Sequence, residues 1–177
     1  MGNKFKLGLV LLTVAVMSSC STKKGFEQTN WLGKNVTIFS EMPENAKVSA
    51  ERKVNTSLLI NSENEFSVKT NRDEQKMVIA FEYLKNEDAA QGGLDYYKEE
   101  ILFEIPSSSF KKTYTNNELQ DVKLLFSKHC YCEGESGYFK VTNGTLKINH
   151  TDDKTNVELK FSVPTKSELK EIEFSVE

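Results

Sequence analysis

An alternation of apolar and polar residues with a period of two constrains the fold of this chain more than any other feature. From residue 31 onward, β-branched and aromatic residues recur at every second position, and polar turn residues separate the runs. This spacing predicts an all-β fold, a single antiparallel β-sandwich or barrel-like domain over residues 31–177. The pattern contains no amphipathic helix of three turns, and one short helical turn is expected between Pro106 and Glu118. The expected strands are Val36–Phe39, Val54–Ile60, Glu65–Lys69, Lys76–Leu84, Tyr97–Ile105, Val122–Ser127, Gly137–Thr142, Thr145–Asn149, Val157–Val163 and Glu171–Val176.

The dipeptide Asn143-Gly144 stands between two alternating runs and predicts a hairpin. Both residue types tolerate the positive φ that a two-residue type I′ turn requires. Such a turn pairs Val141 with Leu146 and Phe139 with Ile148, so that all four apolar side chains share one face.

Two other patterns predict neighbours within a sheet. The near-repeat of Leu159–Val163 in Ile172–Val176 indicates adjacent antiparallel strands that share an apolar face. Met77–Phe81 is apolar on both faces, which is typical of a strand in the middle of a sandwich or barrel. Asp152–Asn156 lacks the glycine and the distal glutamate of a calcium loop, so a hairpin turn is expected there.

The first 19 residues have the layout of a secretory signal rather than of a folded element. Lys4 and Lys6 precede the apolar run Leu7–Met17, and two serines follow it. An eleven-residue apolar run is too short to span a bilayer as a helix.

Met17-Ser18-Ser19-Cys20 resembles the lipobox of bacterial lipoproteins, and its short serine-rich cleavage region is similar to that of lipoproteins of the Bacteroidota. The resemblance implies that residues 1–19 are removed and that Cys20 becomes the lipidated N-terminus, carrying diacylglycerol on sulfur and an acyl chain such as palmitate on its amine. Residues 20–30 are then the lipidated cysteine and a flexible tether. The bilayer is bound through Cys20, and the protein is located at the bacterial cell envelope. Because Ser21 is not the aspartate that retains enterobacterial lipoproteins at the inner membrane, the outer membrane is favoured; the periplasmic face and the cell surface both remain open.

Composition and motifs limit the function. With 23 basic and 26 acidic residues, the chain has no broad cationic surface, and nucleic acid is not an expected partner. The sequence has two histidines and none of the common phosphate-loop, zinc-protease or serine-hydrolase motifs, so no catalytic residue is assigned and an enzyme is not expected.

His129-Cys130-Tyr131-Cys132 gathers both remaining cysteines beside a histidine. Three interpretations stay open: two half-buried thiols, a Cys130–Cys132 disulfide that needs a bent backbone, or a Zn²⁺ or Cu⁺ site of His129, Cys130, Cys132 and His150. The metal site depends on the hairpin register, which places His150 opposite Gly137 near Cys132. Strand parity also directs Lys128 to the core, where an unpaired charge is costly, so a bulge or bend is expected near it.

The function expected first is that of a membrane-anchored envelope lipoprotein whose β-sandwich binds or scaffolds an unidentified protein or small molecule. A metal-handling or redox envelope protein that uses His129, Cys130, Cys132 and His150 is the alternative. A lipocalin-like carrier of a small apolar ligand is a further one, and it requires a large internal cavity.

Overall fold

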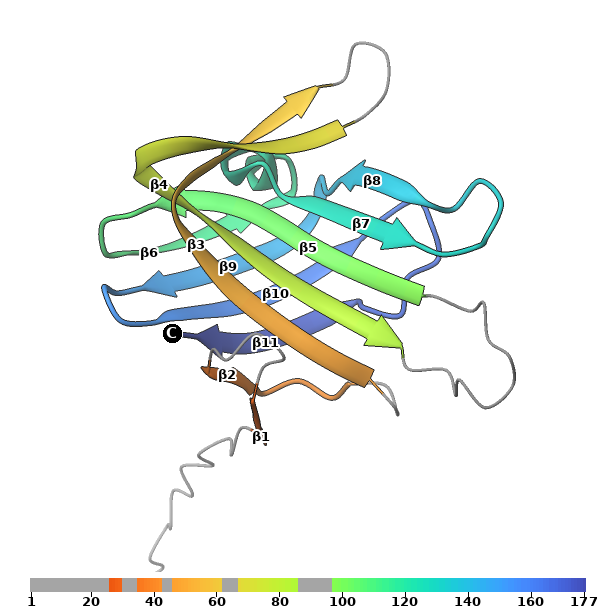
Figure 1. The fold of residues 1–177 in the computed structure, drawn as a ribbon, viewed down its shortest axis with the longest axis horizontal. Helices are drawn as coiled ribbons and strands as arrows, with labels where there is room; N and C mark the ends of the chain where they lie inside the picture. Colours follow the sequence, from red (N-terminus) through yellow and green to blue (C-terminus); the bar gives the residue numbers. More distant parts are fainter. Residues whose placement is uncertain (1–25, 30–34, 43–45, 62–66, 86–96) are drawn as a thin grey trace, which may run out of the picture.

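The computed structural model describes residues 26–29, 35–42, 46–61, 67–85 and 97–177. They form two antiparallel sheets packed face to face, which confirms the all-β sandwich; the sheets do not close into a barrel (Figure 1). Sheet A has the order β1 (Phe26–Thr29), β2 (Asn35–Ile38), β11 (Glu171–Val176), β10 (Thr155–Ser162), β9 (Asn143–His150) and β6 (Phe110–Thr115). Sheet B has the order β3 (Ala46–Asn61), β4 (Ser67–Lys85), β5 (Tyr97–Pro106), β7 (Leu125–His129) and β8 (Gly137–Lys140).

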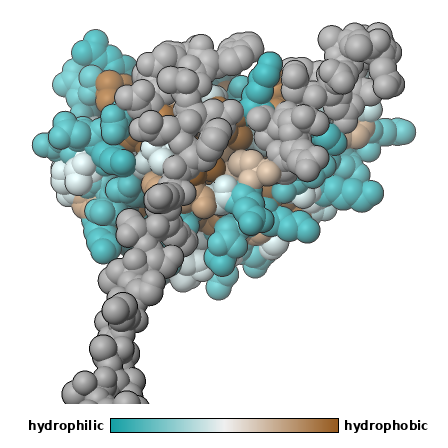
Figure 2. Space-filling model, turned by 90° about the horizontal axis from the view of Figure 1, so that it is seen from below, coloured by the Kyte–Doolittle hydropathy of each residue, from teal (hydrophilic) through white to brown (hydrophobic). Residues whose placement is uncertain are grey.

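The core lies between the inner faces of the two sheets, as the alternating pattern predicts. Phe81 of β4 packs against Phe174 of β11 with ring centroids 4.9 Å apart, and Phe126 of β7 packs against Phe161 of β10 at 5.9 Å. Figure 2, which views the molecule from below Figure 1, shows apolar residues in the middle of this side, with hydrophilic residues around them. Burial of these aromatic side chains supplies a large part of the stabilisation of the sandwich.

Three predicted features of strand pairing are confirmed. β10 and β11 are adjacent and antiparallel, and Leu159 lies opposite Ile172. Residues 77–81 lie in β4 between β3 and β5, where Val78 is buried on the outer face in addition to the inward-facing Ile79. Residues 151–154 form the turn between β9 and β10, closed by a hydrogen bond of 2.8 Å from the Thr151 N–H to the Lys154 carbonyl.

The hairpin predicted at Asn143-Gly144 is wrong. β8 pairs with β7 in sheet B, whereas β9 pairs with β6 and β10 in sheet A, so the chain crosses from one sheet to the other at residues 141–142. The apolar side chains of β8 and β9 therefore meet across the core instead of side by side. An alternating pattern fits both arrangements, because it specifies which face is buried and leaves the neighbouring strand unspecified.

The two strands predicted at 65–69 and 76–84 are one long strand, β4, paired with an equally extended β3. The register shifts between Val54 and Thr56, where Asn55 has φ +54°. Beyond this bulge the hairpin forms an arm, residues 56–61 and 67–72, at the top of Figure 1. The residues between the two predicted strands thus contain a bulge, at 73–76, instead of a turn.

The arm is fixed to the outer face of sheet B by Glu104. This carboxylate accepts hydrogen bonds from the Leu58 N–H at 2.9 Å, Lys76 Nζ at 2.6 Å and Lys123 Nζ at 3.1 Å. Lys123 also donates to the Leu58 carbonyl at 2.7 Å, and the Leu58 side chain is buried.

Three segments differ from the sequence expectation. Residues 26–29 were expected within the flexible tether, and they form β1, paired with β2 through the backbone. Within the segment expected to contain a helical turn, residues 110–115 form β6. The turn itself comes later, as the 3₁₀ helix η2 (Asn116–Val122), with a capping box in which the Thr115 N–H donates to Glu118 at 2.9 Å.

Candidate functional site: the Cys130–Cys132 loop

The candidate site is the loop of residues 130–136, which joins β7 to β8. Cys130 and Cys132 form a disulfide with a Cα–Cα distance of 5.2 Å, and Tyr131 between them is 80% exposed. Ser136 Oγ donates to the Cys130 carbonyl at 2.7 Å and accepts from the Cys130 N–H at 3.2 Å. Gly134, with φ +72°, allows the bend that brings the Glu135 N–H to the Cys132 carbonyl.

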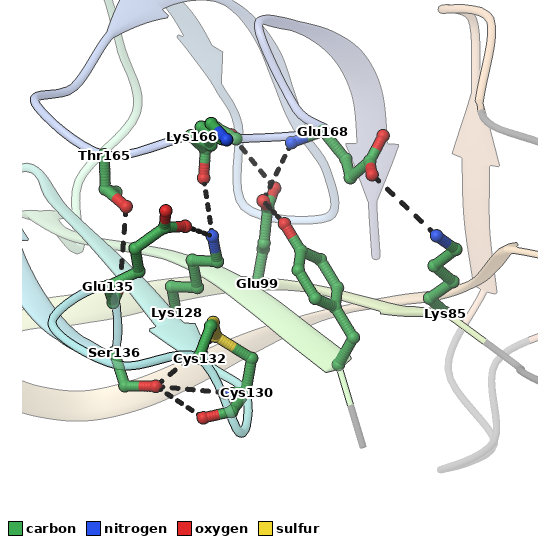
Figure 3. Close-up of polar contacts among 12 residues, drawn as sticks. Lys85, Glu99, Lys128, Cys130, Cys132, Glu135, Ser136, Thr165, Lys166 and Glu168 are labelled. Atoms are coloured by element: carbon green, nitrogen blue, oxygen red, sulfur yellow. Dashed lines mark hydrogen bonds and ion pairs between the residues drawn. A yellow bond between two sulfur atoms is a disulfide. The ribbon is translucent and has the colours of Figure 1, made fainter. Parts of the chain in front are cut away.

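Lys128 holds this loop to the end of the sandwich. It lies on the inner face, as parity predicts, and its ammonium donates to Glu135 at 2.6 Å and to the Lys166 carbonyl at 2.9 Å, as Figure 3 shows. Its hydrogen bond lowers the pKa of Glu135. The bulge expected near Lys128 is wrong, because β7 continues in register with Glu99 and Gly137 on either side. The ion pair compensates the buried charge without any distortion of the strand.

Glu99 of β5 fixes the neighbouring connection between β10 and β11. Its buried carboxylate accepts hydrogen bonds from Ser167 Oγ at 3.0 Å, from the Glu168 N–H at 2.8 Å and from the Leu169 N–H at 3.0 Å. The hydroxyl of Tyr97 donates to the same carboxylate, and burial together with this contact raises the tyrosine pKa. The sandwich end beneath the disulfide loop is therefore held by a network of hydrogen bonds to buried charged groups.

His129 points to the opposite face, the outer face of sheet B, where it contacts Ser127 and Glu100. The same ring nitrogen, Nε2, lies 3.3 Å from Ser127 Oγ and 3.3 Å from Glu100 Oε2, while the serine hydroxyl donates to Glu100 at 2.8 Å. Burial opposes ionisation of Glu100, but hydrogen bonds from Lys98 and Ser127 outweigh it and lower its pKa. In a nucleophilic triad the histidine lies between the serine and the acid, whereas here the serine hydroxyl donates directly to the acid. Ser127 is also fully buried, so the cluster is a structural hydrogen-bond network.

His150 lies at the other end of the molecule. It is paired with Thr155 at the beginning of β10, and its ring nitrogens contact Thr155 Oγ1 at 2.9 Å and the Ser107 carbonyl at 3.3 Å. The cysteine loop instead contacts Thr165 through the Glu135 carbonyl, and Lys128 beside it contacts the Lys166 carbonyl, beyond the far end of β10. Burial is the largest influence on the His150 pKa and lowers it below 6.5.

The four residues proposed as metal ligands are therefore not brought together. The eight residues of β10 separate His150 from the loop by roughly 25 Å at the rise of an extended strand. His129 faces away toward Glu100, and both cysteine sulfurs are used in the disulfide. Within the described ranges no group of three histidine, cysteine or acidic residues is arranged to hold a metal ion. The four-ligand site is therefore not assembled, and the hairpin register that placed His150 near Cys132 is wrong.

Sequence reasoning missed the polar network that positions the loop. Its signal was present: Glu99 and Lys128 both share parity with inward-facing apolar neighbours, and they lie opposite one another in β5 and β7. Opposite charges at inward positions of two strands indicate buried charged groups that are paired or hydrogen-bonded at the end of the core. Cys20, the predicted lipidation site, lies outside the described residues.

The lipocalin-like alternative does not fit this architecture, since the two sheets form an open sandwich rather than a closed barrel around a cavity. A depression of about 490 Å³ lies on the outer face of sheet A, where polar side chains such as Lys147, Asn149, Asn156 and Glu158 line it. In the part of the chain that the structure describes, no helix is long and apolar enough to cross a membrane.

Comparison with known proteins adds no relative from which a function could be transferred. No protein-family model, no curated protein and no solved structure gives a significant match to the chain. The sandwich fold and the geometry of the disulfide loop are therefore the basis for any proposal about function.

Proposed function

We propose that this protein is a lipid-anchored lipoprotein of the bacterial envelope, favouring the outer membrane, and that its β-sandwich binds or scaffolds a partner. One observation carries the proposal: Cys20 directly follows a basic segment, an apolar run and two small residues, the order of a lipoprotein signal. Diacylglycerol on the cysteine sulfur and an acyl chain on its amine would hold the chain at the bilayer, because each buried CH₂ contributes about 0.8 kcal/mol.

The position of β1 supports this arrangement. Five residues lie between Cys20 and Phe26, the first residue of β1, and a fully extended chain of that length reaches about 20 Å. With lipid on Cys20, the β1 edge of sheet A stays close to the bilayer. β6 lies at the opposite edge of sheet A, and β8 lies at the edge of sheet B farthest from β3 (Figure 1). These far edges are the surfaces most open to a partner.

Cys20→Ser in the full chain tests the anchor. The wild-type chain should incorporate labelled palmitate, fractionate with membranes and begin at a lipidated Cys20, whereas Cys20→Ser should incorporate none. Cys130→Ser is the matched control, since it removes another cysteine and should keep both the label and the membrane location. Wild-type protein at the mass of an unmodified chain in the soluble fraction contradicts the proposal.

The binding role is tested separately in intact cells with a photo-cross-linking residue. Lys140 in β8 and Thr37 in β2 offer matched positions at opposite sides of the sandwich. Discrete protein adducts from position 140 that are missing from position 37 support a partner at the far edge. Equal adducts from both positions, or none, contradict it.

A further inference from the structure

We propose that the Cys130–Cys132 disulfide is a thiol–disulfide exchange site that acts on a dithiol partner, with Cys132 as the sulfur attacked and Cys130 as the leaving sulfur. The inference depends on the disulfide loop alone and is independent of the lipid anchor. Of the alternative function, a metal-handling or redox envelope protein, the proposal keeps only the redox activity, and it requires neither His150 nor a metal.

The disulfide contributes little as a structural cross-link. It closes a ring over the single residue Tyr131, and the stabilisation from a disulfide grows with the length of the loop it closes. The same loop is already fixed by Ser136, which bonds both backbone groups of Cys130, and by the pairing of Lys128 with Glu135. A bond that adds so little constraint is better explained by its chemistry.

The disulfide is also accessible. Both cysteines are only partly buried, and the Tyr131 side chain between them is 80% exposed at the tip of the loop. Exposed disulfides are more easily reduced than buried structural ones. An exposed aromatic ring beside the sulfurs gives an incoming polypeptide a surface to contact, as tyrosines do at many interfaces.

The two sulfurs differ in their surroundings. Ser136 Oγ lies 3.4 Å from Cys130 Sγ, and Figure 3 shows this side chain directed at Cys130. Once the disulfide opens, the hydroxyl can turn its single proton from the Cys130 carbonyl to a thiolate at Cys130, because hydrogen bonds to ionised groups are the stronger kind. Among the described residues, no side-chain hydrogen bond to Cys132 Sγ is found. This asymmetry makes Cys130 the better leaving group.

The exchange balances as follows. A thiolate of the partner attacks Cys132 Sγ and forms a mixed disulfide, the Cys130–Cys132 bond breaks, and the electron pair remains on Cys130 Sγ, which then takes up a proton. The second thiolate of the partner attacks the partner's own sulfur in the mixed disulfide, which forms the partner's disulfide and releases Cys132. The partner loses two electrons, and the cysteine pair gains two.

The test uses the full chain in detergent and two probes, glutathione and a reduced peptide with two cysteines. Acid quenching followed by alkylation and peptide mapping should find glutathione on Cys132 and the alkylating reagent on Cys130. The dithiol peptide should become oxidised in a one-to-one ratio with reduction of the protein. Reduction that occurs only in denaturant, or glutathione found mainly on Cys130, overturns the proposal.

Matched variants separate the chemistry from the fold. Ser136→Ala should slow exchange about three- to tenfold, the effect expected from one hydrogen bond, and Ser136→Thr should restore it. In the reduced chain, Ser136→Ala should also shift the pH profile of Cys130 alkylation to higher pH, which a purely structural role would not do.

Tyr131→Ala should slow exchange with the peptide but not exchange with glutathione. Unchanged rates and pH profile in Ser136→Ala contradict the assignment of Cys130 as the leaving sulfur. Because Cys20→Ser tests only the anchor, failure of either proposal is recognised separately.

Discussion

Gly144 lies directly opposite Phe161 in the β9–β10 pair, and the two backbones approach so closely there that no side chain fits at position 144. A Cβ on Gly144 would lie 2.8 Å from the Phe161 Cα and would overlap the Lys160 carbonyl oxygen. Gly144 also has φ +144°, a backbone conformation that residues other than glycine rarely adopt. Glycine at this position is thus required by sheet packing rather than by a turn.

Gly144→Ala should therefore destabilise the protein by about 2–4 kcal/mol, the combined effect of backbone strain and steric overlap. Gly134→Ala is the matched control: Gly134 also has positive φ, but a Cβ there meets nothing within 4 Å. Its cost should be about 1–2 kcal/mol. Chemical denaturation of both variants gives the comparison, and equal losses would show that the close approach to β10 is not the cause.

Glu99→Gln should weaken the connection between β10 and β11. In the wild type, the hydrogen-bond donors of this connection share the two carboxylate oxygens of Glu99, whereas the amide of glutamine has one acceptor oxygen. Leaving a buried donor unpaired costs about 1–3 kcal/mol. Limited proteolysis should then cut more readily after Lys166 or Lys170. Glu168→Gln, on the same connection but with its side chain 45% exposed beside Lys85, should leave both stability and cleavage near wild type.

Glu104→Gln should release the arm of the β3–β4 hairpin from sheet B. We expect a loss of about 1–3 kcal/mol and faster hydrogen exchange at the Leu58 amide, whose acceptor is the Glu104 carboxylate. Burial opposes ionisation of Glu104, but hydrogen bonds from Lys76, the Leu58 N–H and Lys123 outweigh it and lower its pKa below 4.5. The stabilisation is present above pH 4.5 and is lost as the pH falls through the lowered pKa, so the two proteins should converge in acid. Glu74→Gln, at an exposed ion pair, is the control and should change neither measurement.

The buried His150 should make stability fall in mild acid. Burial is the largest influence on its pKa and lowers it; the Ser107 carbonyl and Asp152 raise it, and Arg52 lowers it further. The unfolded chain takes up this proton below pH 6.5 and the folded chain only at lower pH. Stability is therefore retained above pH 6.5 and lost below it, by up to about 1.4 kcal/mol per pH unit.

Denaturation midpoints between pH 7.5 and 5 measure this effect. His150→Gln should show a shallower loss than wild type, and His129→Gln, which keeps His150, should retain the loss. A wild-type slope that persists in His150→Gln would assign the pH dependence to other groups.

Local patterns in the sequence predicted which residues are buried more accurately than which strands are neighbours. The shared face of β10 and β11 and the central position of residues 77–81 follow from apolar side chains that repeat every second residue. The same periodicity predicted a hairpin at Asn143-Gly144, where the chain instead crosses between sheets. Alternation and a turn dipeptide are local signals that fit both a hairpin and a crossing between sheets. Which of the two forms depends on which other strands pair with these edges.

The candidate site divides in the same way. The sequence identified Cys130 and Cys132 as a pair within reach of one another, because their separation along the chain limits their distance. It could not show that His150 lies at the far end of the sandwich, since that depends on whether β9 pairs with β8 or with β10. Nor could it show that Lys128 and Glu135 hold the loop in place.

The sequence by itself determined the all-β class, the buried face of most strands and the order of features that predicts a lipid anchor at Cys20, because each depends on residues close together in the chain. The tertiary structure alone decided which strands share a sheet, where the β3–β4 arm lies and how Glu99, Glu104 and Lys128 are neutralised. Those features depend on contacts between distant residues, such as Lys123 with Glu104, 19 positions apart, and Leu169 with Glu99, 70 positions apart, or on charges that find partners only once the two sheets have packed. Burial of apolar faces favours a sandwich in general, and the satisfaction of buried polar groups selects this particular one.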